Sequence, residues 1–260
     1  MIDVQNQFDH RNIGIDKVGV KDIRYPITVM DRNNGVQHTV ASINMYVNLP
    51  REFKGTHMSR FIELLNEFHG NLDMREFATV LGALRDRLQA QSAHMEMSFP
   101  YFIRKLSPVT ESAGLMEYGC RVSGSLDNRN GYDLVLEVNV PISTVCPCSK
   151  EISDYGAHNQ RGMVRLAVRF KGFIWIEDLV SLVEKAASCD VYSVLKRPDE
   201  KFVTECAYEN PKFVEDVVRD IAYELKNDHN VRWFLVDVEN FESIHNHSAY
   251  ACIERGKGPV

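Results

Sequence analysis

The feature that most constrains the fold of this chain is an order of predicted elements that occurs twice: two strands, two helices and two strands in each half. Alternating apolar residues mark the strands, and apolar residues spaced three and four positions apart mark the helices. The opening strands are joined by a turn that contains Asn34-Gly35, which favours an antiparallel hairpin. We therefore expect an α+β fold with antiparallel sheets covered by helices on one face. The alternative is an unrelated α+β fold whose element count happens to double.

The predicted elements divide the chain into two units of similar length. In the first half we expect strands at 23–30 and 36–49, helices at 57–68 and 74–91, and strands at 95–106 and 116–126. In the second half we expect strands at 132–140 and 163–170, helices at 176–187 and 211–226, and strands at 232–238 and 248–254. These ranges predict a first unit at 21–127 and a second at 128–260, after an N-terminal arm over residues 1–20 that lacks clear periodicity.

Charge and hydropathy exclude several classes of protein. The 260 residues contain 30 Lys and Arg against 36 Asp and Glu, a formal net charge of −6, which argues against a dedicated nucleic-acid binder. No apolar run approaches the roughly 18–20 residues that span a bilayer, and the first 20 residues lack the apolar core of a signal peptide. We expect a cytoplasmic protein with no nucleic-acid or membrane partner.

The six cysteines and nine histidines raise the question of metal chemistry. An even number of cysteines would suit a disulfide framework in a short secreted chain, but this chain is long enough to build a core without disulfides. We expect reduced thiols, and a cysteine with a special role would then be a metal ligand or a nucleophile. Cysteine and histidine together are the usual ligands of softer metals.

Residues 141–162 form the segment richest in reactive side chains. About 20 residues without predicted structure between two strands are usually functional or disordered. Cys146-Pro147-Cys148 is not a CxxC motif, which disfavours a redox pair or a zinc ribbon. Cys146 and His158 can share one metal if this segment folds back on itself, although isolated Cys and His residues are more often structural.

Two further segments are candidates for the same site. His245 and His247 would point to one face if they lay on a strand, and the alternative is a polar turn with exposed histidines. The charged segment 196–201, which reads KRPDEK, precedes an expected helix start at Thr204, and such a charge run is most often solvated surface.

Several motifs give this chain a family resemblance. Residues 146–161 read CPCSKEISDYGAHNQR, and the segments GTHMSR, LKRPDEK, YENPKFVED and ESIHNHSAYA occur elsewhere in the chain. Together these motifs resemble GTP cyclohydrolase of type IB, and they extend from about residue 55 to residue 252.

The resemblance implies a fold, an assembly and a reaction. The family has the tunnelling fold, or T-fold, in which two tandem ββααββ units assemble into oligomeric barrels. Type IB enzymes are similar to one another in forming homotetramers, with active sites between subunits. The family converts GTP and water to 7,8-dihydroneopterin triphosphate and formate, the first step of tetrahydrofolate biosynthesis.

The resemblance also implies roles for particular residues. One divalent metal per site, Zn, Mn or Fe, would be held by Cys146, His158, Glu200 and His245. Such a metal lowers the pKa of bound water and so supplies a nucleophile for C8 of guanine. The catalytic residues would be Cys146, His158 and His247, and His158 could act as a proton shuttle in place of a ligand.

Substrate recognition is implied at a second set of residues. Glu215 would be a buried carboxylate that reads the ring N–H and amino groups of guanine, whereas the alternative is an ordinary acid in the first turn of a helix. Cations suited to the triphosphate are Lys150, Arg161, His57 and Arg60, with Lys196 and Arg197.

Two alternatives remain: a different T-fold enzyme, such as a nitrile reductase with a cysteine nucleophile, and a non-enzymatic protein whose metal has a closed coordination sphere.

Overall fold

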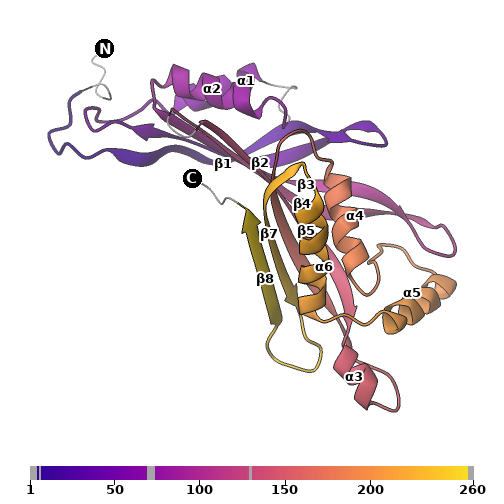
Figure 1. Ribbon diagram of the computed structural model, residues 1–260. Helices are drawn as coiled ribbons and strands as arrows, with labels where there is room; N and C mark the ends of the chain where they lie inside the picture. The colour runs from indigo at the N-terminus through magenta and orange to yellow at the C-terminus, as the bar shows by residue number, and fades with distance from the viewer. Residues whose placement is uncertain (1–4, 6, 69–73, 129–130, 257–260) are drawn as a thin grey trace. The chain divides into compact units, whose positions relative to one another are not determined.

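The structure is a computed structural model that describes residues 5, 7–68, 74–128 and 131–256. The first half contains β1 (Ile15–Asp31), β2 (Gly35–Leu49), α1 (Ser59–Glu67), α2 (Phe77–Arg87), β3 (Ser92–Leu106) and β4 (Ala113–Asp127) (Figure 1). The second half contains β5 (Gly131–Val145), α3 (Pro147–Ile152), β6 (Asn159–Phe170), α4 (Ile176–Ala186), α5 (Arg197–Glu209), α6 (Val214–Asn227), β7 (Val231–Asn240) and β8 (Ala249–Gly256). No helix among these residues is long and apolar enough to cross a membrane.

The strands follow one another through the sheet in chain order, from β1 to β8, and each is hydrogen-bonded to the next. Pairing is antiparallel between β1 and β2, β2 and β3, β6 and β7, and β7 and β8. The expected α+β architecture with antiparallel sheets and covering helices is confirmed. The second half also contains the short helix α3, which the sequence periodicity does not predict, and the helix α5, which begins at Arg197 and not at the expected start Thr204.

In the first unit, α1 and α2 pack against each other and lie over the strands (Figure 1). Phe61 and Leu64 of α1 and Phe77 and Leu81 of α2 have no exposed surface. Phe77 packs so closely on Gly124 of β4 that a Cβ at this position would lie 2.8 Å from its ring. Glycine is therefore needed here for helix-to-sheet contact.

In the second unit, α6 packs against α4, β7 and β8 (Figure 1). The predicted apolar stripe of α6 is buried as expected, and it comprises Val214, Val217, Val218, Ile221 and Leu225. This packing places the first turn of α6 beside the start of β6 and the end of β7, where the candidate site lies.

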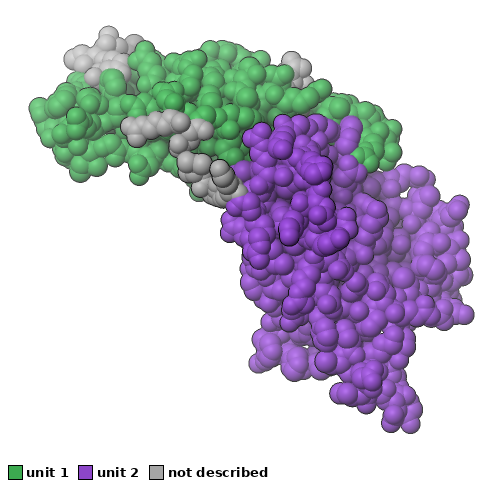
Figure 2. All heavy atoms as spheres, viewed as in Figure 1, with its two compact units in different colours: residues 1–100, 121–136, 259–260 green, residues 101–120, 137–258 purple. Residues whose placement is uncertain are grey.

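The division into compact units differs from the predicted boundaries. Within the described residues, the first unit takes in 1–100 and 121–136, and the second takes in 101–120 and 137–256 (Figure 2). The division crosses β3, β4 and β5 because each of these strands is 15 residues long and contributes residues to both units. The expected arm is also shorter, since β1 already begins at Ile15.

The β1–β2 turn depends on one buried carboxylate, Asp31, which is 6% exposed. Its Oδ1 accepts hydrogen bonds from the backbone N–H groups of Asn33 and Asn34, both at 2.9 Å. Its Oδ2 accepts from the side chains of Asn34 and Gln37. Burial alone would raise the pKa of this carboxyl, but the hydrogen bonds from Asn34, Asn33 and Gln37 outweigh it, so the pKa lies below its ordinary value.

We expect Asp31→Ala to lower the free energy of unfolding by about 1–3 kcal/mol at pH 7, because these donors lose a charged acceptor. Because the pKa of Asp31 is lower in the folded state, its contribution to the free energy of unfolding is fully present above the unfolded pKa. It is lost as the pH falls below about 4 and through the folded pKa. Urea unfolding at pH 7 and pH 3 should show the gap between wild type and variant closing at low pH. The exposed Asp16 of β1 offers a control, Asp16→Ala, and an equal gap at both pH values would contradict the assignment.

Candidate active site

A cavity of about 460 Å³ lies in the second unit and has the size of a small-molecule site. Its walls combine a thiol, imidazoles, carboxylates and amides. The lining residues are Cys146, His158, Gln160, Lys212, Phe213, Val214, Glu215, Asn240, Glu242, His245, His247, Ser248 and Ala249. Residues from five separated parts of the chain therefore meet here, and several of them carry the predicted chemistry.

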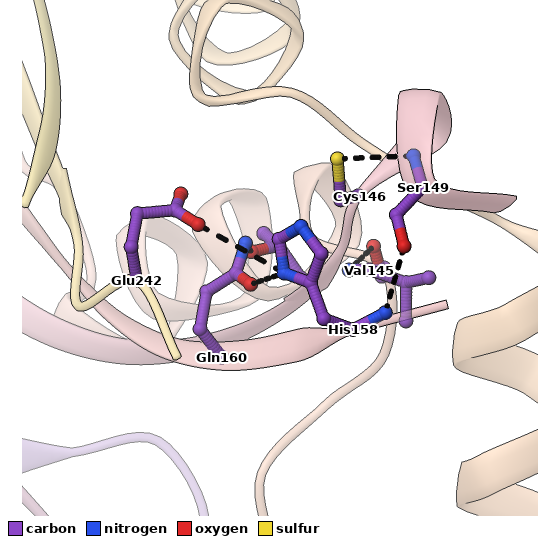
Figure 3. Close-up of polar contacts among 8 residues, drawn as sticks. Val145, Cys146, Ser149, His158, Gln160 and Glu242 are labelled. Atoms are coloured by element: carbon purple, nitrogen blue, oxygen red, sulfur yellow. Dashed lines mark hydrogen bonds and ion pairs between the residues drawn. The ribbon is translucent and has the colours of Figure 1, made fainter. Parts of the chain in front are cut away.

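The segment that holds Cys146 and His158 folds back on itself, as the metal hypothesis requires (Figure 3). The Cys146 N–H donates to the His158 carbonyl at 3.1 Å, and the His158 N–H donates to Ser149 Oγ at 3.1 Å. Cys146 is also the N-cap of α3, where its Sγ accepts from the Ser149 N–H at 3.4 Å and Pro147 occupies the first turn. The backbone thus fixes the thiol and the imidazole beside each other.

A chain of hydrogen bonds orients the His158 ring (Figure 3). The Gln160 Nε2 donates to Thr144 Oγ1 at 3.0 Å, and both side chains are buried. In this orientation the Gln160 Oε1 faces His158 Nδ1 at 3.0 Å, so a neutral imidazole carries its proton on Nδ1. The Nε2 lone pair is then available to bind a metal or to accept a proton.

Strand alternation determines which side chains reach the cavity. Gln160 and Gly162 lie on the same face at the start of β6, which His158 directly precedes, and Gly162 pairs with Asn240 of β7. The Phe241 N–H donates to the Arg161 carbonyl of β6 at 2.8 Å, so the register continues past the end of β7. It places Glu242 beside Gln160, with its Oε2 3.9 Å from His158 Nδ1.

The histidine segment is a loop between β7 and β8 and not a strand. His245 and His247 nevertheless both line the cavity. Their rings are stacked with centroids 5.0 Å apart and planes 16° from parallel. The expectation that they share a site is consistent with this arrangement, although a strand is not what brings them together.

Glu215 also lines the cavity, from the first turn of α6. The neighbouring Asp216 caps this helix, because its Oδ2 accepts from the Phe213 N–H at 2.9 Å. The Glu215 carboxylate is therefore not used by the helix end and is left to face the cavity. It is exposed in the single chain, which differs from the expected buried carboxylate.

Several predicted residues lie elsewhere. Lys150 Nζ donates to the carbonyl of Tyr208 and lies 4.4 Å from the centre of its ring, so it is engaged with the end of α5. Arg161 lies on the opposite face of β6 from Gln160, because it alternates with it and is exposed. Arg161 therefore does not line this cavity in the single chain, and its expected contact with the triphosphate stays a prediction. His57 and Arg60 belong to the first unit, where the Arg60 N–H donates to the His57 carbonyl.

The charged segment 196–201 begins α5 and is held by Asp199, which is fully buried. The Asp199 carboxylate accepts from the backbone N–H groups of Val109 and Thr110, from the Thr110 hydroxyl and from the Lys196 N–H. Burial would raise the pKa of Asp199, but these hydrogen bonds hold it well below its ordinary value. Lys196 and Arg197 thus mark the start of a helix, and the adjacent Glu200 is exposed and is not part of the cavity lining.

The cavity supplies donor atoms for a metal without an assembled coordination sphere. In the part of the chain that the structure describes, no three Cys, His, Asp or Glu side chains lie close enough together to hold an ion. Cys146, His158 and His245 share the cavity, and their sulfur and nitrogen atoms suit a borderline or soft divalent metal. Glu200, the fourth expected ligand, does not line the cavity of the single chain. All six cysteines are free thiols, as expected.

A comparison with known protein families identifies the family of this chain. The model of a protein family described as type I GTP cyclohydrolase folE2 matches residues 1–251. The chain belongs to this FolE2 family. A GTP cyclohydrolase FolE2 from Syntrophobacter fumaroxidans is 81% identical over 257 residues, which cover 99% of this chain and 100% of that protein. Another FolE2, from Desulfosudis oleivorans, is 61% identical and covers 99% of each chain.

Comparison with solved structures tests the expected fold. A uricase from Arthrobacter globiformis superposes with a TM-score of 0.54 over 95% of this chain and 96% of that one, at 7% identity. A urate oxidase from Bacillus subtilis gives a TM-score of 0.55 over 93% of this chain and 98% of that one, at 8% identity. At this identity the likeness shows the fold alone, and it confirms the expected tunnelling fold.

Proposed function

We propose that this chain is a GTP cyclohydrolase of type IB, which converts GTP and water to 7,8-dihydroneopterin triphosphate and formate in the first step of tetrahydrofolate biosynthesis. The observation that carries the proposal is the closed Cys146–His158 segment beside Glu215 in one cavity. These groups suit a reaction that adds water to C8 of guanine, opens the imidazole ring and hydrolyses the resulting formamide. Family membership supports the same conclusion.

His158 and its partners are suited to proton transfer. Gln160 and Thr144 hold the imidazole with its proton on Nδ1, so Nε2 can take a proton from water and return it to the nitrogen released on ring opening. Glu242 lies near Nδ1 and would stabilise the imidazolium that forms in between. His247 lines the same cavity and is the second candidate for proton transfer.

We also propose one divalent metal per site, Zn, Mn or Fe, held by Cys146, His158 and His245. When bound, such an ion lowers the pKa of water and polarises the bond under attack. The donor chemistry of the three side chains supports this assignment. With the metal on Nε2 of His158, proton transfer would pass to His247, so the two roles of His158 are alternatives.

The negative charge of the triphosphate favours a site that is completed by a second copy of the chain. Among the described residues, Lys212 is the one Lys or Arg side chain in the cavity lining, and its Nζ already lies 2.7 Å from Asp220 Oδ2. A single chain therefore leaves the phosphate charges largely uncompensated in this cavity. We propose a homotetramer in which cations of a neighbouring subunit, His57 and Arg60 among them, meet the triphosphate.

The test is turnover by metal-depleted protein supplied with GTP and, separately, with Zn, Mn, Fe or Mg. We expect formate release and, after oxidation, pterin fluorescence with one or more of the first three ions. Absence of both products with every ion would overturn the proposed reaction. Sedimentation equilibrium of the loaded protein tests the assembly, and a monomer would contradict the shared site.

A further inference from the structure

The floor of the cavity contains a polar atom that the fold does not use. Asn240, the last residue of β7, is 2% exposed, and its side chain faces the cavity. Its Oδ1 is buried and has no hydrogen-bond partner among the residues that the structure describes. A buried acceptor without a donor destabilises a folded protein, so its presence beside a cavity indicates a donor that arrives from outside.

The residue paired with Asn240 makes room for the amide. Gly162 of β6 lies directly opposite Asn240, and a Cβ at this glycine would lie 2.5 Å from Asn240 Oδ1. Glycine and asparagine are both disfavoured inside strands, and a glycine there often marks a close approach of another group. Here the close group is the Asn240 amide. Gly162 and Asn240 each weaken their own strand, and together they keep Asn240 Oδ1 turned toward the cavity.

We propose that Asn240 determines substrate specificity by accepting a hydrogen bond from the exocyclic amino group of guanine. This inference rests on the proposed function, in which Glu215 accepts from the same edge of the base. That edge carries three N–H bonds, one on N1 and two on the amino nitrogen. A carboxylate that binds side-on satisfies two of them, which leaves one amino hydrogen for a second acceptor. Asn240 Oδ1 supplies a buried acceptor in the same cavity.

Inosine triphosphate isolates this contact, because it keeps the N1–H and lacks the amino group. We expect Asn240→Ala to reduce the preference for GTP over inosine triphosphate, as a ratio of kcat/KM values, by about ten-fold or more. The kcat/KM for inosine triphosphate should change by less than about two-fold, because that substrate never makes the contact. Asn139→Ala is the matched control: this asparagine of β5 donates to the Gly119 carbonyl outside the cavity, and both substrates should be unaffected.

A binding measurement separates this proposal from the proposed reaction. 7-Deaza-GTP retains the whole hydrogen-bonding edge but has carbon in place of N7, so its ring cannot be hydrolysed at C8. Dissociation constants of 7-deaza-GTP and 7-deaza-inosine triphosphate on the metal-loaded protein should show the same loss of preference in Asn240→Ala. If wild-type protein fails to hydrolyse GTP, the reaction is wrong, and these constants still decide the role of Asn240.

Stability distinguishes a binding role from a structural one. Asn240→Val replaces the unpartnered amide with a residue suited to a strand, so we expect it to melt at or above the wild-type temperature and to show the same loss of preference. A lower melting temperature with an unchanged preference would assign Asn240 to the fold and overturn the proposal. An equal loss for both nucleotides, or no loss for either, would also overturn it, because neither depends on the amino group.

Discussion

Replacing Cys146 by alanine should lower GTP turnover by about 10³-fold or more, the scale expected when a strongly stabilising electrostatic group is lost from an active site. The thiol lines the cavity beside His158 and makes one hydrogen bond, from the Ser149 N–H at 3.4 Å. If it is a metal ligand, bound metal measured by elemental analysis should fall together with turnover. The melting temperature should stay close to that of wild type, because this hydrogen bond caps only the six-residue helix α3.

A matched cysteine variant separates the effect of the site from a general effect of losing a thiol. Cys252 of β8 is exposed and is not part of the cavity lining, so Cys252→Ala should retain both metal and turnover. Full activity of Cys146→Ala with metal intact would contradict the ligand assignment. It would move the role to Cys148, which lies two residues away in α3.

The parts of the fold that could be predicted from sequence are those with a periodic apolar surface. The stripe of α6 and the alternation along β7 each record burial on one face, so local spacing is enough to identify them. The sequence also indicated how Cys146 could approach His158. The segment between them joins two neighbouring strands, β5 and β6, so its two ends must lie close together. These features depend on residues close together in the chain.

The start of the helix α5 shows why other features could not be predicted. Its apolar contacts come from Val203, Cys206 and Ala207, which pack with Val145 and Cys189, whereas the buried residue of its first turn is the carboxylate Asp199. It is anchored in part by hydrogen bonds from Val109 and Thr110 to the Asp199 carboxylate, about 90 residues away in sequence. A helix start fixed by a distant polar contact is indistinguishable, in sequence, from a solvated charged segment.

The cavity residues missed by sequence reasoning depend on strand register. Glu242 and Asn240 reach the site only because β7 pairs with β6 so that Gly162 faces Asn240. A shift of one residue would turn both side chains to the other face. Once the start of β6 is known, the alternation of its side chains between the two faces predicts which residues reach the cavity. It assigns Gln160 to the face of the cavity and Arg161 to the opposite face.

Glu215→Gln should reduce kcat/KM for GTP by about ten- to a hundred-fold, because an amide N–H would then face the N–H groups of guanine and leave them mispaired. Inosine triphosphate should suffer a comparable loss, since it shares the N1–H that this carboxylate accepts, whereas Asn240→Ala should spare it. Metal content should be normal, and inorganic tripolyphosphate should inhibit variant and wild type equally, because the phosphate contacts are untouched. Steady-state kinetics with both nucleotides provides the measurement.

The adjacent carboxylate is the control that excludes an effect of charge at the helix end. Asp216 accepts from the Phe213 N–H at 2.9 Å and caps α6, so Asp216→Asn should cost about 1 kcal/mol of stability and leave kcat/KM near that of wild type. Glu215→Gln should lose turnover, with at most about 0.3–1 kcal/mol of stability lost through the helix dipole. If Glu215 were only a surface acid of the first turn, its variant would keep wild-type kinetics. A loss of turnover in Glu215→Gln but not in Asp216→Asn would locate recognition of the base at Glu215, since both variants remove one negative charge from the same turn of the helix.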